Sequence, residues 1–337
     1  GAYPGPACYG NGNDRPTVTD ANMVLGYLNP RALAGGSLRV QPQLSAQAIQ
    51  RHIAAPLGLD LMRAAHGIRR VANVSMARAI RAVTIERGRD PRDMTMIAFG
   101  GGGPLHAADV ARLLGVRRVI APVMAGVFCS AGMLSADAEH NFVKAILRPL
   151  ALCDATKVQA AIDELREQGF AVLESEGYPA TSVDVIASAD LRYLGQSSEL
   201  TVPIPGAFDE PGTIAALARD FNALYERTFG YSSDEPLELV NVRVFAYGRS
   251  DQRLDFGKSG VDDSALRGET GTRDVSFDPD GPPCPTRLLP RSAVGAEPID
   301  GPLIIESYDT TIVVPPNARA WADAAGNIII DLLPEKA

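Results

Sequence analysis

Four consecutive glycines, Gly100–Gly103, are the residues of this sequence with the clearest potential for binding chemistry. Glycine permits positive φ angles and lets a ligand approach the backbone closely. A helix is expected directly after the glycines, and the first turn of a helix has unpaired N–H groups and a partial positive charge. A phosphate group or a flat nucleotide ring could therefore bind at Gly100–Gly103 and Pro104. The alternative is a tight turn that serves packing alone.

The glycine run does not match the common nucleotide-binding motifs. No Gly-Lys-Ser/Thr follows it, so it is not a Walker A loop. A dinucleotide fingerprint has a third glycine, and Pro104, Leu105 and His106 stand where that glycine belongs. The fingerprint also needs an acidic residue about 20 positions later, and none is present. The sequence also has no Gly-x-Ser-x-Gly elbow to support a catalytic triad.

A few other residues are candidates for a site. His106 lies one helical turn after the glycines and is a candidate catalytic residue, with a helix-capping or partly buried histidine as the alternative. Asp20 is a second catalytic candidate. Asp20 and Asn22 could serve a phosphate-bound magnesium ion, whereas an N-cap is the alternative for Asp20. Cys8 could bind a metal or react as a thiol, and a buried thiol is its alternative.

The residues around the glycines predict a βαβ unit. Met94–Phe99 is a short apolar run that is typical of a buried strand. Leu105–Leu114 has a helical pattern that ends at Gly115, and Val116–Ala121 predicts a second strand. Such a unit has a right-handed crossover between parallel strands. Ligands of these sheets bind at the carboxyl ends of the strands, where the glycines lie.

Hydrophobic periodicity predicts the remaining elements. Helices are expected at 21–28, with Asp20 or Thr19 as the N-cap, at 45–58, at 61–86 as one or two helices, at 154–177 and at 213–230. Strands are expected within 183–204 and at 237–247, 303–306, 310–314, 318–321 and 327–332. Residues 250–300 are rich in Gly, Pro and Asp and predict an irregular excursion.

The pattern changes character after Pro149, which predicts a domain boundary near residue 150. An α/β nucleotide-binding lobe is expected at 1–149 and an α+β domain at 150–337. Gly1 opens a turn sequence without an initiator Met, so a cut, processed or fragmentary chain is expected.

Composition narrows the class of protein. The 337 residues are 46% hydrophobic and 21% charged, as is usual for a soluble globular protein. A net charge of -8 without a basic stripe argues against a nucleic-acid partner. No apolar stretch approaches the roughly 20 residues that span a bilayer, and no signal peptide begins the sequence. Cys8, Cys129, Cys153 and Cys284 match no metal or disulfide spacing, so free thiols in a cytoplasmic protein are expected.

Six groups of residues together resemble the hydantoinase A/5-oxoprolinase family, which is related to the ATP-using subunits of acetone and acetophenone carboxylases. In chain order they are 4–10, 16–22 with 24–26, 79–81 with 86–91, 98–107, 191–196 with 199–200, and 301–306 with 310–316. They cover nearly the whole chain, and the first four groups are the more specific. Tyr3 departs from the acidic residue expected before Pro4.

The resemblance implies an α/β fold, namely the second lobe of an actin-like ATPase of the sugar-kinase and heat-shock type, followed by an α+β C-terminal domain. It matches Gly100–Gly103 with the loop that holds the adenosine end of ATP. The family uses ATP and a divalent metal, expected to be magnesium, to phosphorylate the carbonyl of a small cyclic amide. The activated ring of a hydantoin, 5-oxoproline or lactam is then open to water. Related members activate ketones for carboxylation.

The resemblance also indicates what this sequence lacks. The family's N-terminal lobe carries an Asp-Gly-Gly-Thr phosphate loop and a second phosphate loop shortly before the Pro-Gly-Pro segment, and neither occurs here. Because phosphoryl transfer depends on positioning and charge neutralisation at the phosphates, this chain alone is expected to be inactive. The expected partners are a complementary N-terminal phosphate-binding lobe and a hydantoinase B-type subunit. A ketone carboxylase subunit and a non-catalytic nucleotide-binding or assembly module are the alternatives.

Overall fold

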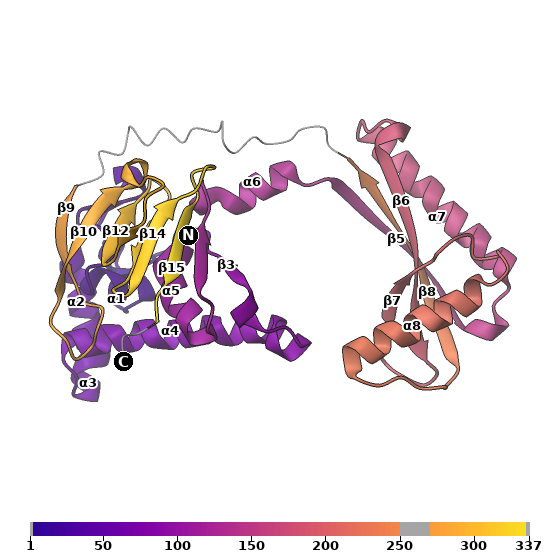
Figure 1. The fold of residues 1–337 in the computed structure, drawn as a ribbon, viewed down its shortest axis with the longest axis horizontal. Helices are drawn as coiled ribbons and strands as arrows, with labels where there is room; N and C mark the ends of the chain where they lie inside the picture. Colours follow the sequence, from indigo (N-terminus) through magenta and orange to yellow (C-terminus); the bar gives the residue numbers. More distant parts are fainter. Residues whose placement is uncertain (1–2, 250–269, 335–337) are drawn as a thin grey trace. The chain divides into compact units, whose positions relative to one another are not determined.

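The computed structural model of the protein describes residues 3–249 and 270–334, which form two compact units (Figure 1). The first unit contains the residues before Met133 together with the described residues from 270 onward. The second unit contains the described residues from Met133 to Arg249. The second unit has a hydrophobic core of its own, and two further core clusters lie in the first unit.

The helices of the first unit lie mostly before residue 115. They are α1 (Val18–Val24), α2 (Pro42–Ile49), α3 (Ala55–Leu57), α4 (Leu61–Val83) and α5 (Gly103–Leu114), and α6 (Phe128–Ser135) ends in the second unit. A π-helical segment, Gln50–Ala54, joins α2 to α3, so the helix expected at 45–58 has an irregular middle. The region expected to hold one or two helices at 61–86 forms the single long helix α4.

The strands of the first unit form a small hairpin and two larger sheets. The hairpin pairs β1 (Ala32–Leu33) with β2 (Leu38–Arg39). One sheet has the order β13-β12-β10-β9, from β9 (Gly271–Val275), β10 (Cys284–Pro290), β12 (Leu303–Glu306) and β13 (Thr311–Val314). The other has the order β11-β14-β15-β4-β3, from β3 (Thr95–Ile97), β4 (Arg118–Ala121), β11 (Ile299–Asp300), β14 (Ala318–Ala322) and β15 (Ile328–Leu332).

The expected βαβ unit is confirmed, but its first strand is not buried as expected. Strand β3 lies at the edge of its sheet, and its Thr95 and Ile97 side chains are exposed. Strands β3 and β4 are parallel, with Thr95 opposite Arg118, and α5 connects them. The helix ends at Gly115, whose φ of 73° is the left-handed conformation that glycine adopts without strain. This unit places Gly100–Gly103 between the end of β3 and the first turn of α5.

Two hydrophobic clusters sandwich the sheet that contains β12 and β13. Leu303 and Ile305 of β12 pack into the cluster that includes α5, whereas Ile304 packs into the cluster that includes α1, α2 and α4. This alternation is the two-residue period of a strand that is buried on both faces. Figure 1 shows the N-terminal helices packed against this sheet. The hairpin β12–β13 is therefore a rigid element near the glycines.

The compact units do not follow the expected division into 1–149 and 150–337. Strand β15 pairs antiparallel with β4, which returns the end of the chain to the first unit. Hydrophobic periodicity predicts a strand but not its pairing partner, so the sequence pattern places β15 with its neighbours in sequence. As a division into family domains, the boundary near residue 150 stays a prediction.

Residues 250–300 are expected to be irregular, and 250–269 lie outside the described residues. Within 270–300 the prediction is wrong, because β9, β10 and β11 are strands. Strand β10 contains Pro285 and Pro290, and proline is unfavourable in a sheet interior. Pairing with β9 on one side and β12 on the other stabilises β10 in spite of its composition.

The second unit is an antiparallel sheet packed with two helices. Its strands are β5 (Ala138–Pro149), β6 (Val183–Tyr193), β7 (Leu200–Pro203) and β8 (Leu237–Gly248), in the order β5-β8-β6-β7. Its helices are α7 (Ala155–Ser175) and α8 (Thr213–Phe229). The paired strands expected within 183–204 are confirmed as β6 and β7.

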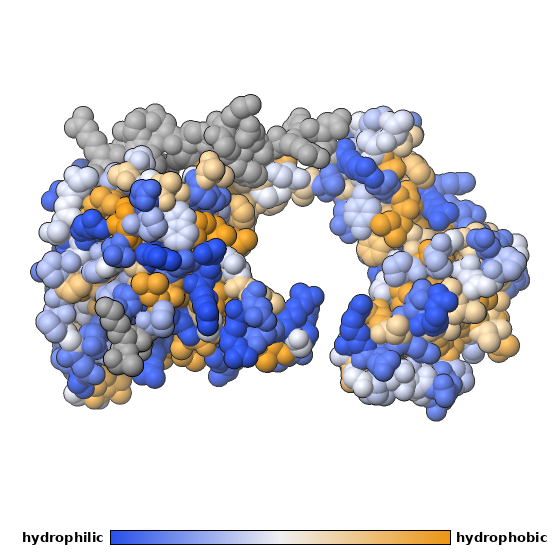
Figure 2. All heavy atoms as spheres, in the orientation of Figure 1, coloured by the Kyte–Doolittle hydropathy of each residue, from blue (hydrophilic) through white to orange (hydrophobic). Residues whose placement is uncertain are grey.

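The surface is mixed in character. Polar and apolar residues are interspersed on the visible face of each unit (Figure 2). Among the described residues, no helix is both long enough and apolar enough to cross a membrane.

Candidate functional site

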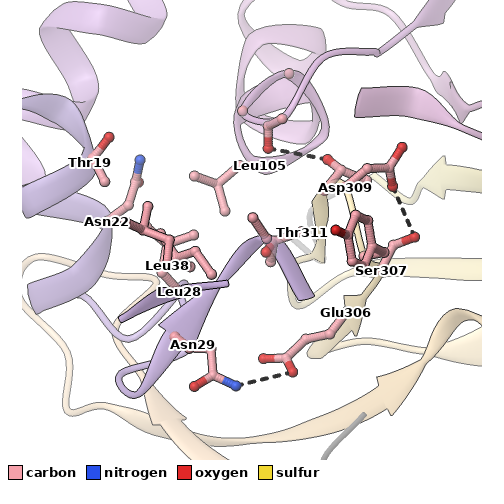
Figure 3. A pocket seen from close by; sticks show the side chains of 18 of the residues that line it. Thr19, Asn22, Leu28, Asn29, Leu38, Leu105, Glu306, Ser307, Asp309 and Thr311 are labelled. Carbon is pink, nitrogen blue, oxygen red and sulfur yellow. Dashed lines mark hydrogen bonds between the residues drawn. The ribbon is translucent and has the colours of Figure 1, made fainter. Parts of the chain in front are cut away.

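A cavity of about 1080 Å³ lies in the first unit beside the glycines. Six parts of the chain line it: Tyr9, α1 with the loop that follows, the hairpin β1–β2, α4, the glycines with α5, and the turn between β12 and β13 (Figure 3). Pockets for small ligands usually measure about 300–1,000 Å³. The cavity is therefore large enough for a nucleotide.

The glycines leave one wall of this cavity without side chains. Gly101, Gly102 and Gly103 line the cavity. Gly102 has an ordinary φ of -110°, and a Cβ atom added there would have no heavy atom of the described residues within 4 Å. A flat group can thus lie against the backbone. Of the four glycines only Gly100 has a positive φ, +82°, so the expectation of unusual backbone angles is confirmed at that position alone.

The turn between β12 and β13 holds the glycine segment in place. The Thr310 hydroxyl lies 3.2 Å from the carbonyl oxygens of both Gly100 and Gly101, and it can donate to either. The Gly126 N–H donates to the Asp309 carboxylate over 2.7 Å. A Cβ atom at Gly126 would lie 2.5 Å from Asp309, so only glycine fits there. One polar turn thereby fixes the segments that follow β3 and β4.

Glu306 ends β12 and supplies a carboxylate at the wall of the cavity. It accepts hydrogen bonds from Arg273 over 3.2 Å and from Asn29 over 3.4 Å. The side chains of Glu306 and Arg273 are each only 13% exposed. Figure 3 shows Asn29 and Glu306 pointing toward one another. This charge is held by residues that are far apart in the sequence.

His106 lines the cavity and joins three helices. Its Nδ1 lies 2.6 Å from the Asn73 side-chain oxygen, and its Nε2 lies 3.0 Å from the Asn22 side-chain nitrogen. With Asn73 as acceptor and Asn22 as donor, the proton belongs on Nδ1. Arg69 extends the network, because it donates to the Asn22 oxygen and forms an ion pair with Asp109 at 3.0 Å.

This network keeps His106 uncharged. Burial lowers the pKa of His106 to about 4, and the nearby Arg69 guanidinium adds to that effect. The neutral imidazole can orient Asn22 at the cavity wall. The surroundings of His106 are those of a buried histidine. Its catalytic role stays a prediction.

Asp20 and Cys8 lie in a neighbouring buried cluster instead of in the cavity wall. The fully buried Asp20 carboxylate accepts hydrogen bonds from the backbone N–H groups of Ala7 and Cys8 and from the side chains of Thr17 and Ser45. Burial raises the pKa of Asp20, but these hydrogen bonds outweigh it and the pKa falls below its usual range. Asp20 thus stays ionised and ties the N-terminal loop to two helices.

Thr17, and neither Asp20 nor Thr19, is the N-cap of α1, so that expectation is wrong. Asp20 is the third residue of the helix, and its carboxylate accepts the Thr17 N–H over 2.9 Å in a capping box. Burial and the adjacent Asp20 charge raise the pKa of the Cys8 thiol to about 12, which leaves it protonated.

The described residues contain no group of three or more His, Cys, Asp and Glu side chains that could hold a metal ion. Asn22 has both side-chain polar atoms engaged with Arg69 and His106. The proposed metal-ligand roles of Asp20, Asn22 and Cys8 stay predictions.

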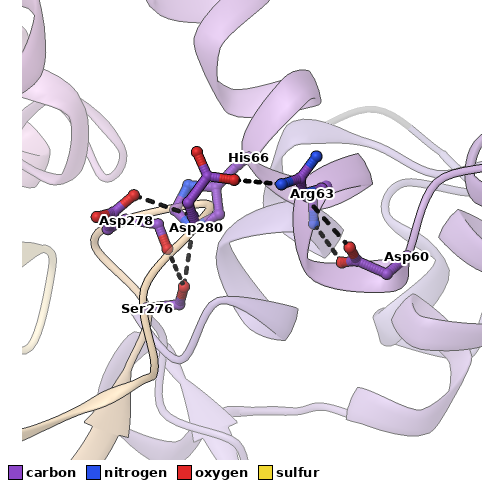
Figure 4. Close-up of polar contacts among 6 residues, drawn as sticks. All are labelled: Asp60, Arg63, His66, Ser276, Asp278 and Asp280. Atoms are coloured by element: carbon purple, nitrogen blue, oxygen red, sulfur yellow. Dashed lines mark hydrogen bonds and ion pairs between the residues drawn. The ribbon is translucent and has the colours of Figure 1, made fainter.

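A second, smaller cavity of about 330 Å³ is lined by Arg69, Asn73 and Asp109 of the same network. His66 lines it and its Nε2 lies 2.8 Å from the Ser276 hydroxyl. Figure 4 shows this contact beside the Arg63 pairs with Asp60 and Asp280. Burial and Arg69 lower the pKa of His66 as well.

The structure brings Gly101–Gly103, Asn22 and His106 together at one cavity, as the sequence prediction requires for a common site. Sequence reasoning did not identify Glu306, Asp309 or the hairpin β1–β2 as part of it. The sequence does contain a signal for the turn with Glu306 and Asp309, since Glu306 begins a run of polar residues between two apolar strands.

The sequence of this chain is similar to those of known proteins. The model of the hydantoinase/oxoprolinase family matches residues 1–142, and the model of the hydantoinase/oxoprolinase C-terminal domain matches residues 151–240. The chain is 36% identical to the caprolactamase subunit alpha of Pseudomonas jessenii over 96% of this chain and 47% of that protein. It is 30% identical to the acetophenone carboxylase gamma subunit of Aromatoleum aromaticum over 99% of this chain and 47% of that one.

A solved structure agrees with the fold. The crystal structure of the ATP-dependent caprolactamase from Pseudomonas jessenii matches with a TM-score of 0.78 and 33% identity, over 98% of this chain and 49% of that one. The expected actin-like ATPase fold class is confirmed. The chain spans about half the length of the curated relatives it matches.

Proposed function

The chain belongs to the hydantoinase/oxoprolinase family, and from that premise we propose that it is the C-terminal part of an ATP-dependent hydrolase of cyclic amides. Its first unit would bind the nucleoside end of ATP in the cavity beside Gly101–Gly103. The substrate would be a lactam, hydantoin or 5-oxoproline, whose carbonyl is activated by phosphorylation before water opens the ring.

The cavity itself is the observation that carries this proposal. Its volume suits a nucleotide, and its glycine wall presents bare backbone to a flat ring. Thr310 and Asp309 hold the segments beside that wall, while the Asn22–His106–Asn73 bonds hold α1 and α4 to α5. The site is thus preorganised by residues that themselves need not touch the phosphates.

ATP supplies the phosphoryl group when it is bound, and the residues of this chain would orient its nucleoside. The sequence contains no Asp-Gly-Gly-Thr phosphate loop, so we assign the phosphoryl-transfer residues to a complementary lobe. A hydantoinase B-type subunit is the second proposed partner. The described residues contain no group of three or more metal-binding side chains, so a residue of this chain that holds a divalent metal would do so together with the phosphates.

The substitution Gly102→Val tests the cavity. Valine would place a branched side chain in the open space where the nucleoside should lie. The backbone φ of -110° suits valine, so the fold should be retained. We expect ATP affinity to fall at least about tenfold, measured by calorimetric titration of the chain.

Gly67→Val is the matched control. Gly67 is an exposed residue of α4 outside the cavity, and an added Cβ would also meet no heavy atom of the described residues within 4 Å. This variant should bind ATP like the parent protein. Equal ATP affinity for both variants would show that the glycine segment serves packing alone.

The hydrolase activity needs a reconstituted enzyme. The chain, a polypeptide with the complementary lobe and a B-type subunit would be mixed with ATP and caprolactam, hydantoin or 5-oxoproline. We expect phosphate release and ring opening in equal amounts. Phosphate release without ring opening for every such ring would contradict this substrate class.

A ketone carboxylase subunit is the second candidate, and the 30% identity to the acetophenone carboxylase gamma subunit favours it specifically. The same reconstituted enzyme would then consume a ketone only when bicarbonate and ATP are both present. Nucleotide binding without either activity in any reconstitution would instead favour a non-catalytic nucleotide-binding or assembly module.

A further inference from the structure

The charged side chains at the cavity nearly balance one another. Among the described residues that line it, Glu306 and Asp309 carry negative charge and Arg31 carries positive charge. His106 is neutral because burial and Arg69 lower its pKa to about 4. The N-terminus of α5 adds about half a positive charge. Arg273, whose ion pair with Glu306 spans 3.2 Å, offsets the charge of that carboxylate. The charges therefore nearly balance, and the described residues of the cavity give it no large excess of positive charge to hold a triphosphate.

Glu306 is positioned to accept further hydrogen bonds. Its carboxylate receives one bond from Arg273 and one from Asn29, whereas a carboxylate has about four acceptor positions. The ion pair with Arg273 holds the side chain at the cavity wall, where it is 13% exposed. Donors of a bound ligand can reach the remaining positions. Sugar hydroxyls are neutral donors that suit such an acceptor.

Apolar side chains lie in the same cavity as this carboxylate. Leu28, Leu38 and Leu105 line it together with the glycine wall (Figure 3). A flat heteroaromatic ring would be stabilised by this surface, and a hydroxylated sugar by Glu306. The combination matches the two halves of a nucleoside.

We propose that Glu306 determines specificity by accepting hydrogen bonds from the ribose hydroxyls, and that the cavity binds the nucleoside without help from the phosphates. This inference rests on the proposed nucleotide site and names the group that recognises the sugar. Asp309 lines the same cavity, and its carboxylate accepts the Gly126 N–H over 2.7 Å, so it holds the neighbouring segment in place.

The test compares ligands on the unaltered chain. Adenosine, 2′,3′-dideoxyadenosine and ATP without added metal would be titrated by calorimetry. We expect adenosine and ATP to bind within about threefold of each other. The dideoxy compound should bind about tenfold more weakly, because each lost hydrogen bond to a charged acceptor weakens binding.

Glu306→Gln is the variant, and Glu238→Gln is its control. Glu238 is also paired with an arginine, Arg192 at 2.7 Å, and is 15% exposed, but it lies in the second unit. Glu306→Gln should reduce the preference for adenosine over the dideoxy compound to less than about threefold. Glu238→Gln should leave the preference unchanged. Thermal unfolding of both variants checks that the fold is intact.

The possible outcomes separate this inference from the proposed function. Equal affinities for adenosine and dideoxyadenosine would overturn the role of Glu306. ATP binding more than about tenfold tighter than adenosine would overturn binding without help from the phosphates. If Gly102→Val weakens ATP binding even when one of these results is found, the proposed nucleotide site is still supported. If no adenosine-containing ligand binds the chain, both proposals are wrong.

Discussion

The two units of this protein bury different kinds of residue. Of the twelve buried polar or charged residues among those described, nine belong to the first unit and three to the second. In the first unit, Arg69 alone contacts Asn22, Leu105 and Asp109, which lie on two other helices. In the second unit, Asp190 binds Thr201, Asn241 and Arg243 on adjacent strands of one sheet.

The core of the second unit depends on apolar and aromatic packing. Phe221 and Leu217 of α8 are fully buried, and the rings of Phe221 and Tyr193 lie 5.2 Å apart edge to face. The second unit is thus stabilised by contacts that do not require ligand binding. In the first unit, hydrogen bonds and ion pairs join distant segments around the cavity. The first unit therefore contains the candidate binding site, whereas the second unit has a core of apolar packing.

Phe221→Ala should have the largest effect, and it should be confined to the second unit. Truncating a fully buried phenylalanine leaves a cavity and costs about 4 kcal/mol. We expect faster amide exchange in α8 and β8, measured by mass spectrometry in urea, with unchanged ATP affinity. A parallel loss of ATP affinity would show that the units are not independent.

Arg69→Met should destabilise the first unit by about 3 kcal/mol, because it leaves buried acceptors without their charged donor. Amide exchange should accelerate in α1, α4 and α5. The control is Arg192→Met in the second unit, where the arginine side chain is more exposed than that of Arg69 and the loss should be about 1 kcal/mol. Equal effects of both substitutions would remove the contrast between the units.

Mild acid should weaken the first unit through His106. The unfolded chain takes up this proton near pH 6.5 and the folded chain only near pH 4, so stability is complete above pH 6.5 and falls as the pH drops toward 4. Between pH 6.5 and 5 the loss should be about 2 kcal/mol. His106→Gln should remove this part of the pH dependence of urea unfolding, whereas His66→Gln should retain it. An unchanged pH profile in His106→Gln would contradict the assignment.

The elements that sequence reasoning identified correctly have strong local signals. The βαβ unit has an apolar strand, a glycine run and a helix that stops at Gly115, and each signal depends on neighbouring residues. Strand β10 has no such signal, because two prolines interrupt it and its partners supply its stability. The strand expected at 327–332 is present, but its pairing with β4 joins residues about 200 positions apart and was not predictable from periodicity.

The residues of the candidate site also differ in how far the sequence predicts their role. Gly100–Gly103 and His106 follow from residue type and spacing, and the fold places Gly101–Gly103 and His106 at one cavity. Asp20 carries the same chemical groups as a catalytic carboxylate, yet five donors enclose it. Residue type does not distinguish an enclosed carboxylate from an accessible one, and that distinction governs its chemistry.

The sequence by itself determined the family resemblance, the glycine segment and the helix that follows it, because these depend on residue type and short-range order. Only the tertiary structure decided that Glu306, Asn29 and Arg273 meet at the cavity and that Thr310 binds the glycine carbonyls. Those contacts join residues that are 33 to 277 positions apart, and they form only when both sheets and their helices are packed.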